Sequence, residues 1–381
     1  MRLLGDFDVA EEIVQDTLVI ALERWRADGI PDRPGAWLTT AARRRAIDRL
    51  RRDGAYRHKL ALLAAEPFAP ADPDDRLRLI FTCCHPALSR EAQLALTLRA
   101  VCGFTTAQIA HAFVVSEAAV AQRLARARRK IVTAGIPYRV PDPDELDERL
   151  TQVLAVLYLM FNEGYLASAD GPPTRRDLTA DAAALTGLLG TLYPRHAETL
   201  GLLALIRLHL ARAGSRFTAG HDLVLLPDQD RGSWDRVLIA DALALLDRAA
   251  ALRRPGPYQL QAAIVACHTE ARTWRDTDWP QILALYDLLL THAPSPVVRL
   301  NRSVAVLHVA GPAAALGELD GLAAELDGYH LYHAVRGHVL VELGRREQAR
   351  AAELRALALT ANRAEQSLLR RRLGRSFSDS H

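Results

Sequence analysis

Apolar residues recur at helical spacing along most of the chain, and the pattern is clearest between residues 105 and 131. A short helix is predicted over 105–112, with a tight connection over 113–115. Ser116 suits the N-cap of the next helix, because its hydroxyl can accept a hydrogen bond from a free amide of the first turn. That second helix is predicted to reach residue 131 on a buried stripe of Val120, Leu124, Ala127 and Ile131. The pattern therefore predicts a helix-turn-helix.

The outer face of this second helix is small at its start and basic along its length. The side chains that point away from the buried stripe are Ala118, Gln122, Ala125 and Arg129. The basic side chains that flank them are Arg123, Arg126, Arg128 and Lys130. Small residues allow close approach to the major groove, and Gln122 and Arg126 are long enough to reach base edges. The face indicates DNA binding; a basic, solvated surface on an ordinary helical pair is the alternative.

A second basic helix is predicted near the start of the chain. Residues 8–27 form one amphipathic segment, which a Gly- and Pro-containing stretch ends. The segment that follows, AWLTTAARRRAIDRLRR over residues 36–52, places Arg45, Arg49 and Arg52 on one face. Six arginines with a single aspartate argue for phosphate contact, and a charged, solvated surface helix is the alternative.

Composition fits packed helices in two or three domains. Of 381 residues, 50% are hydrophobic and only 6% aromatic, so an all-α fold is expected. No apolar run is long enough for a membrane span and no signal peptide is evident, which predicts a cytoplasmic protein. Residues 1–140 hold 22 Lys and Arg against 16 Asp and Glu, a net +6, so the remainder carries −3. This excess of basic residues indicates that a nucleic-acid partner binds the first part of the chain, residues 1–140.

The four cysteines predict neither a metal site nor a redox motif. Cys83 and Cys84 are adjacent, and His85 beside them does not complete a zinc pattern. We expect buried structural thiols, no metal and no cofactor.

Proline-rich stretches divide the chain. A linker is predicted over 54–74, two helices that brace the helix-turn-helix follow it, and a domain boundary is expected after residue 136. The predicted domains are 1–53, the linker, 75–136 and 144–381.

Three segments in this order resemble the extracytoplasmic-function (ECF) sigma factors of bacterial RNA polymerase. They are AEEIVQDTL (10–18), AWLTTAARRRAIDRLRR (36–52) and TTAQIAHAF-VVS-EAAVAQRLARARRKI (105–131). They resemble the polymerase-binding helix of sigma region 2, the −10 recognition helix and the region 4 helix-turn-helix. Region 2 starts late here, Arg44 stands where the family usually has Asn, Gln108 replaces a common Glu and Val114 a common Gly.

The resemblance implies partners and residue roles. The partners would be core RNA polymerase, through its β′ clamp and β flap, and promoter DNA. The polymerase-binding residues would be Glu11, Glu12, Gln15 and Asp16. The −10 element would meet Trp37, Arg44, Arg45, Asp48, Arg49 and Arg52. The −35 element would meet Ser116, Glu117, Ala118, Gln122, Arg123, Arg126 and Arg129.

Residues 144–381 are nearly all in helical pattern. Helices are predicted at 145–161, 177–190, 196–212, 235–252, 257–272, 279–291, 296–309, 312–325, 329–343 and 346–361. Ala315 and Ala349 lie 34 residues apart, and Val306 and Leu340 share that offset, which indicates a tetratricopeptide-like repeat with a surface for an intramolecular or protein partner.

Two further stretches, LMFNEGYLAS (159–168) and DLVLLPDQDRGSWDRVLIADAL (222–243), resemble the extension of a sigma-factor subgroup that has a tetratricopeptide-like C-terminal domain. An enzymatic interpretation would use Glu163, Asp228 and Asp230 as acids or metal ligands. No His joins them at ligand spacing, and the neighbouring arginines favour a charged network that fixes a loop, or a regulatory contact.

We therefore expect a transcription initiation factor with no catalytic residues, whose C-terminal domain regulates it. The alternative is a helical-repeat interaction scaffold that carries a degenerate DNA-binding head.

Overall fold

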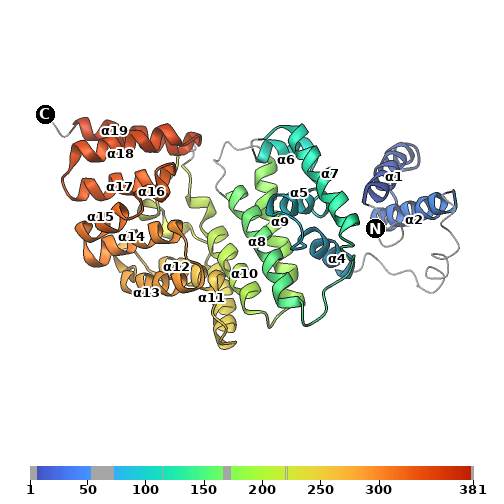
Figure 1. The fold of residues 1–381 in the computed structure, drawn as a ribbon, viewed down its shortest axis with the longest axis horizontal. Coiled ribbons are helices and arrows are strands. Elements are labelled where there is room, and N and C mark those ends of the chain that lie inside the picture. Colours follow the sequence, from blue (N-terminus) through green and yellow to red (C-terminus); the bar gives the residue numbers. More distant parts are fainter. Residues whose placement is uncertain are drawn as a thin grey trace. The chain divides into compact units, whose positions relative to one another are not determined.

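The computed structural model describes residues 7–52, 73–113, 115–165, 173–218, 220 and 222–378. Helices carry the fold throughout these residues, so the expected all-α class is confirmed (Figure 1). The chain divides into two compact units, Met1–Val156 and Leu157–His381.

The first unit opens with α1 (Phe7–Asp28) and α2 (Pro34–Arg52), close to the bounds that the sequence predicts. Ile13, Ala21 and Ala46 are buried between them. The rings of Trp25 and Trp37 meet edge to face with centroids 5.6 Å apart, a favourable geometry that joins the two helices. The predicted linker falls mainly on residues 53–72, which lie outside the described residues, as does Val114.

A four-helix body follows, formed by α4 (Pro73–Cys83), α5 (Arg90–Ala100), α6 (Thr106–Ala112) and α7 (Glu117–Thr133). Its fully buried large side chains are Ile80, Phe81, Leu96, Leu98 and Ile109. Cys83 and Cys84 are buried, as expected for structural thiols, whereas Cys102 is only half-buried. Burial raises the pKa of Cys84 to about 11.

The first half of α8 (Leu146–Tyr165) also belongs to this unit. The buried Arg149 donates from Nη2 to the carbonyl oxygen of Phe81 at 2.6 Å, near the end of α4. Arg90 donates to the carbonyl oxygen of Gln152 at 3.3 Å. The compact unit thus extends about three helical turns past the proline-rich stretch where the sequence places a boundary. The domain limits themselves remain predictions.

The second unit continues the helical pattern. Its helices are α9 (Pro173–Leu192), α10 (Ala197–Ala211), α11 (Arg236–Ala251), α12 (Pro257–Glu270), α13 (Trp279–His292), α14 (Pro296–Ala310), α15 (Pro312–Asp320), α16 (Ala323–Leu326), α17 (His330–Glu342), α18 (Arg346–Leu359) and α19 (Arg363–Ser378). Short 3₁₀ turns lie at Ala213–Ser215, Leu226–Asp228, Arg231–Ser233 and Trp274–Asp276.

All ten helices predicted for this part of the chain are present, with two differences. The helix expected over 312–325 is split into α15 and α16, because the chain turns at Gly321. The last helix, α19, was not predicted, because its arginines dilute the apolar pattern to a few residues such as Ala364, Leu369 and Leu373.

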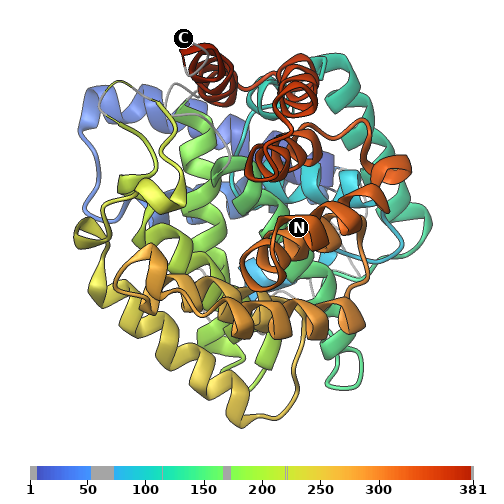
Figure 2. The same cartoon turned by 90° about the vertical axis from the view of Figure 1, so that its left-hand side faces the viewer.

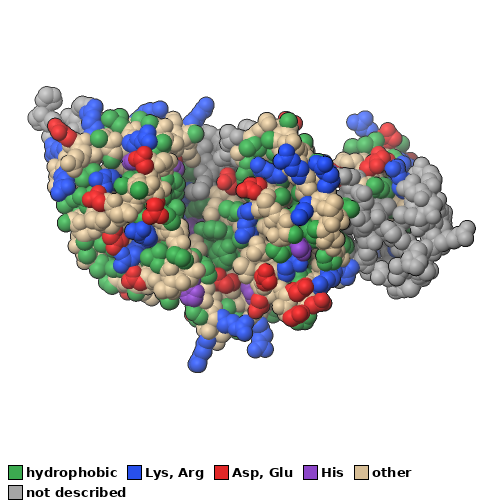
Figure 3. All heavy atoms as spheres, in the orientation of Figure 1, with side chains coloured by type: hydrophobic (Ala, Val, Ile, Leu, Met, Phe, Trp, Pro, Cys, Tyr) green, Lys and Arg blue, Asp and Glu red, His purple; other side chains and the backbone are tan. Residues whose placement is uncertain are grey.

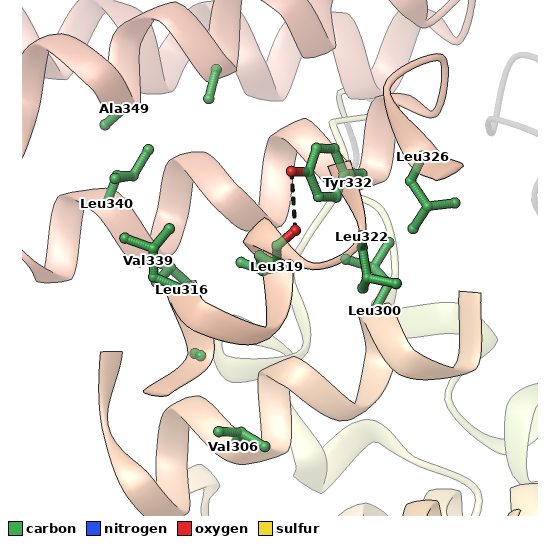
Figure 4. Packing of buried hydrophobic residues seen from close by; sticks show 12 residues of the cluster. Leu300, Val306, Leu316, Leu319, Leu322, Leu326, Tyr332, Val339, Leu340 and Ala349 are labelled. Atoms are coloured by element: carbon green, nitrogen blue, oxygen red, sulfur yellow. Dashed lines mark hydrogen bonds between the residues drawn. The ribbon is translucent and has the colours of Figure 1, made fainter. Parts of the chain in front are cut away.

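The helices from α14 to α18 share one apolar core, shown in Figure 4. Leu300, Leu319 and Val339 are buried in it, and the hydroxyl of Tyr332 donates to the carbonyl oxygen of Leu319 at 3.2 Å. At Gly337, an added Cβ would lie 3.0 Å from Cγ of Glu353, so α17 and α18 require a small residue where they meet. Figure 2 shows α11 to α19 following one another in an arc. This packing of successive helical pairs supports the tetratricopeptide-like interpretation.

Candidate nucleic-acid interface

Two side-chain caps fix the helix-turn-helix. Ser116 accepts a hydrogen bond at Oγ from the amide of Ala119 at 3.2 Å, so the predicted N-cap of α7 is confirmed. At the start of α6, Thr105 Oγ1 accepts from the amide of Gln108 at 3.1 Å, and Gln108 Oε1 accepts from the amide of Thr105 at 2.8 Å. This reciprocal pair is a capping box, in which Gln can replace Glu. Both helices therefore begin at defined residues.

The two faces of α7 are separated as the sequence predicts. The buried residues of the helix are Val120, Leu124, Ala127 and Ile131. On the other side, Gln122, Arg126 and Arg129 are exposed with Ser116, Glu117 and Ala118, while Arg123 is half-buried. Lys and Arg side chains gather over α6 and α7 in Figure 3. All seven residues predicted for the −35 element thus lie along one accessible helix.

A groove of about 410 Å³ runs between the start of α5 and the basic face of α7. Ser89 and Ala92 line its α5 side, and Gln122, Arg126 and Lys130 line its α7 side. Ser89 caps α5 by accepting from the amide of Ala92 at 3.4 Å, which places the positive end of a helix dipole beside the basic side chains. Sequence reasoning missed Ser89, although a serine before Arg-Glu and an apolar run is an N-cap signal.

The residues predicted for the −10 element pair with those predicted for polymerase. Arg45 contacts Asp16 at 3.2 Å, and Arg49 contacts Glu12 at 3.8 Å. The four side chains are between 39% and 60% exposed, so these pairs are weak and open to competition.

The other predicted −10 residues differ in their surroundings. Trp37 packs on Trp25, whereas Arg44 and Asp48 are exposed. Arg52 is the last residue of α2, and its side chain lies outside the described part.

Glu11 lies in a different environment from the other predicted polymerase-binding residues. Its carboxylate forms ion pairs with Arg99 of α5 and Arg128 of α7. A pocket of about 530 Å³ surrounds these pairs, and the exposed Gln15 also lines it. Sequence reasoning did not find Arg99 and Arg128 as partners, because 88 and 117 residues separate them from Glu11.

The FNEGY stretch of the extension packs as an aromatic and cationic cluster. Tyr165 lies 4.9 Å from His209 between ring centroids, and the guanidinium of Arg216 lies 3.9 Å from the Tyr165 ring. Burial lowers the pKa of His209 well below its usual value, and Arg212 and Arg216 lower it further. Residues 166–168 of this stretch lie outside the described residues.

The DQDR segment fixes a loop, and two of its acids do so as helix caps, while Asp228 lies within electrostatic reach of Arg372. Asp230 accepts from the amide of Gly232 at 2.8 Å, and Asp235 accepts from the amide of Leu238 at 2.9 Å, so both are helix caps. Arg231 instead donates to the backbone carbonyls of His268 and Ala271 at the end of α12. Short acids cap local helix starts, whereas the long arginine reaches a distant helix end.

These features define a helical DNA-binding protein with a repeat extension, and comparison with known proteins identifies the family. "Sigma-70 region 2" matches residues 1–56, "Sigma-70, region 4" matches residues 78–131, and a "Family of unknown function (DUF6596)" matches residues 149–250. A Rhizobium meliloti (strain 1021) protein described as uncharacterized is 43% identical over 98% of this chain and 91% of its own length. The ECF RNA polymerase sigma factor SigL of Mycobacterium tuberculosis is 33% identical over 34% of this chain and 77% of its own length.

The chain therefore belongs to the ECF sigma factors, with a C-terminal extension. It is a DNA-binding transcription factor that works with core RNA polymerase at promoters, and such factors are non-enzymatic. Among the described residues, no cluster of His, Cys, Asp and Glu could hold a metal ion. None of the described helices is long and apolar enough to cross a membrane.

Proposed function

We propose that α7 reads the −35 element and α2 contacts the −10 element. The observation that carries this proposal is the exposed face of α7, on which Gln122, Arg126 and Arg129 surround a start of small residues. Arginine and glutamine read base edges by paired hydrogen bonds, and the helix can enter the major groove because Val120, Leu124 and Ile131 face the core and leave the basic face open. The cap at Ser89 adds a phosphate contact beside the groove.

We propose that α1 binds the β′ clamp helices and that the helix-turn-helix body contacts the β flap. Glu12 and Asp16 are exposed near an apolar stripe on the same helix, where Val14, Leu18 and Leu22 are 46%, 38% and 66% exposed. Acids beside exposed apolar residues suit a protein interface. When the acids engage polymerase, Arg45 and Arg49 lose their partners in α1 and become available to DNA phosphates.

In vitro transcription with core polymerase tests these roles. Arg126→Ala should lower discrimination among −35 sequences by about 1–3 kcal/mol if the side chain reads a base. Arg76→Ala, which removes an exposed arginine of α4, is the matched control and should leave discrimination unchanged. An equal loss on every sequence would make Arg126 a phosphate contact. A protein that does not co-purify with core polymerase would favour the scaffold alternative.

We propose that the extension regulates the sigma factor in cis. In support, α8 begins inside the first unit, where Arg149 binds the end of α4, and the helices that follow build a repeat-like core of their own, a kind of fold that binds protein partners. Transcription by a chain that ends at residue 144 is the direct test, and unchanged activity and polymerase affinity would reject regulation.

The deletion also removes Arg149, so a second variant is needed to interpret it. Arg149→Met retains the extension but breaks the contact with α4. If this substitution reproduces the effect of the deletion, the effect comes from a weakened helix-turn-helix body and not from regulation.

A further inference from the structure

The extension gathers arginines around its 3₁₀ turns. Burial lowers the pKa of Arg231, and the neighbouring cations Arg212 and Arg236 lower it further, with only Asp276 opposing them. Arg216 is half-buried, and its partial burial lowers its pKa, to which the neighbouring Arg212 again contributes. Several guanidinium groups therefore lie within electrostatic reach of one another in the interior of this unit.

Three of these arginines bind neutral groups. Arg231 donates from Nη1 to the carbonyls of His268 and Ala271, and Arg216 donates to the carbonyl of Tyr165. Arg212 contacts Nδ1 of His209 at 3.1 Å. Helix-end carbonyls offset part of a cationic charge. Within the described residues, however, no carboxylate forms an ion pair with Arg212, Arg216 or Arg231. A buried cationic group usually has an anionic partner.

Unpartnered polar atoms lie in the same region. Arg231 is only 9% exposed, and its Nη2 has no hydrogen-bond partner in the described part of the chain. The same holds for Nε of Arg212, Nδ1 of His268 and Oγ1 of Thr277, all buried. Arg231 binds the carbonyl of His268, and the charges of Arg212 and Arg231 both act on the His268 ring. The unpartnered atoms of Arg212, Arg231 and His268 therefore form one neighbourhood.

Flat rings adjoin the arginines. Trp274 stacks on His268 with centroids 5.8 Å apart, and Trp279 stacks on His308 at 3.8 Å. His268 also meets Trp279 edge to face at 5.3 Å, so the rings continue directly from the arginine neighbourhood. His308 is exposed at the end of this stack, where another flat ring can pack.

We propose that this neighbourhood is a binding site for a small organic anion, in which a phosphate or carboxylate meets Arg212 and Arg231 and an attached flat ring packs on the Trp279–His308 stack. Arginine suits both oxyanions, because its planar fork donates two parallel hydrogen bonds. The site would give the extension a ligand of its own, separate from DNA and polymerase. It also accounts for the DQDR segment, which brings Arg231 to the end of α12.

Isothermal titration of the full chain tests the proposal with AMP, benzoate, inorganic phosphate and adenosine as probes, at matched ionic strength in sodium chloride. AMP or benzoate should bind saturably and more tightly than the neutral adenosine. Binding of AMP and phosphate without benzoate identifies a phosphate site, and the reverse identifies a carboxylate site. The proposal is overturned if none of the probes binds saturably. It is also overturned if added sodium chloride gives the same heat response as the probes.

Two variants and a control locate the site. Arg212→Gln should weaken binding about tenfold or more, because a charge-assisted hydrogen bond is lost. His308→Ala removes an exposed ring and should weaken AMP or benzoate while leaving phosphate unchanged. Arg248→Gln, which removes a cation of α11 outside the neighbourhood, should leave every affinity unchanged. Melting curves verify that each variant folds. Unchanged affinities in both Arg212→Gln and His308→Ala would place the anion elsewhere and overturn the assignment.

Discussion

Replacing Arg149 by Met should weaken the helix-turn-helix body, although Arg149 lies outside the segment that resembles sigma region 4. Arg149 is 9% exposed, and its guanidinium donates to the carbonyl oxygen of Phe81 at 2.6 Å. Phe81 is itself fully buried in the core of that body. Methionine retains an apolar stem of similar length, so the substitution removes mainly the charged donor.

The expected magnitude follows from the hydrogen bond that is lost. A hydrogen bond to a charged group contributes about 1.5–3 kcal/mol. Burial lowers the pKa of Arg149, which shows that desolvation already opposes its charge and reduces the net benefit. We therefore expect the free energy of unfolding of this body to fall by about 2 kcal/mol.

Hydrogen exchange is the suitable assay, because none of the five Trp residues lies between residues 73 and 156 to report by fluorescence. Amides of α5 and α7 should exchange about 30-fold faster, since 1.4 kcal/mol corresponds to a factor of ten. Arg139→Met is the matched control: Arg139 is 40% exposed and pairs with Asp142 and Glu145, so its loss should cost under about 1 kcal/mol. Equal protection in the Arg149 variant and the wild-type chain would refute the reasoning.

Three further outcomes are expected. If the two basic helices neutralise roughly 5–8 phosphates, the promoter affinity of the polymerase complex should fall with salt. A plot of the logarithm of the affinity against the logarithm of the salt concentration should have a slope of about −5 to −7. A flat plot would contradict DNA contact by both helices. Gly201→Ala should destabilise the extension by about 1–3 kcal/mol, because the added Cβ would lie 2.7 Å from the amide nitrogen of Gln259. Gly187→Ala is the control and should leave the stability unchanged, because the space around Gly187 is open. Urea unfolding followed by Trp fluorescence measures both variants. Burial lowers the pKa of His268 to about 4 in the folded chain, whereas an unfolded histidine has a pKa of about 6.5. As the pH falls below about 6.5, the unfolded chain therefore takes up a proton at His268 before the folded chain does. His268 should therefore contribute about 2 kcal/mol to the loss of stability of the extension between pH 7 and pH 5, and His268→Gln should remove that share in the same urea assay, while the buried His209 still contributes its own.

The local features were accessible from the sequence, because they depend on neighbouring residues. Helical periodicity located the buried stripe of α7, and the Ser116 cap fixed where that helix begins. The same periodicity failed for α19, where arginines are as numerous as apolar residues and packing against the rest of the extension maintains the helix. Asp230 shows a related limit: charge alternation suggested ion pairs with arginine, but a backbone amide two residues away is closer for so short a side chain.

The sequence by itself determined the all-α class, the two basic helices and the order of segments that marks an ECF sigma factor, since each is encoded in a short window of residues. Only the tertiary structure decided which distant side chains meet. It places Glu11 between Arg99 and Arg128, joins Arg149 to α4, and brings Arg212 and Arg231 together with no ion-paired carboxylate among the described residues. Long side chains from separate helices make these contacts. Their partners depend on how the helices pack, a property that no local pattern records.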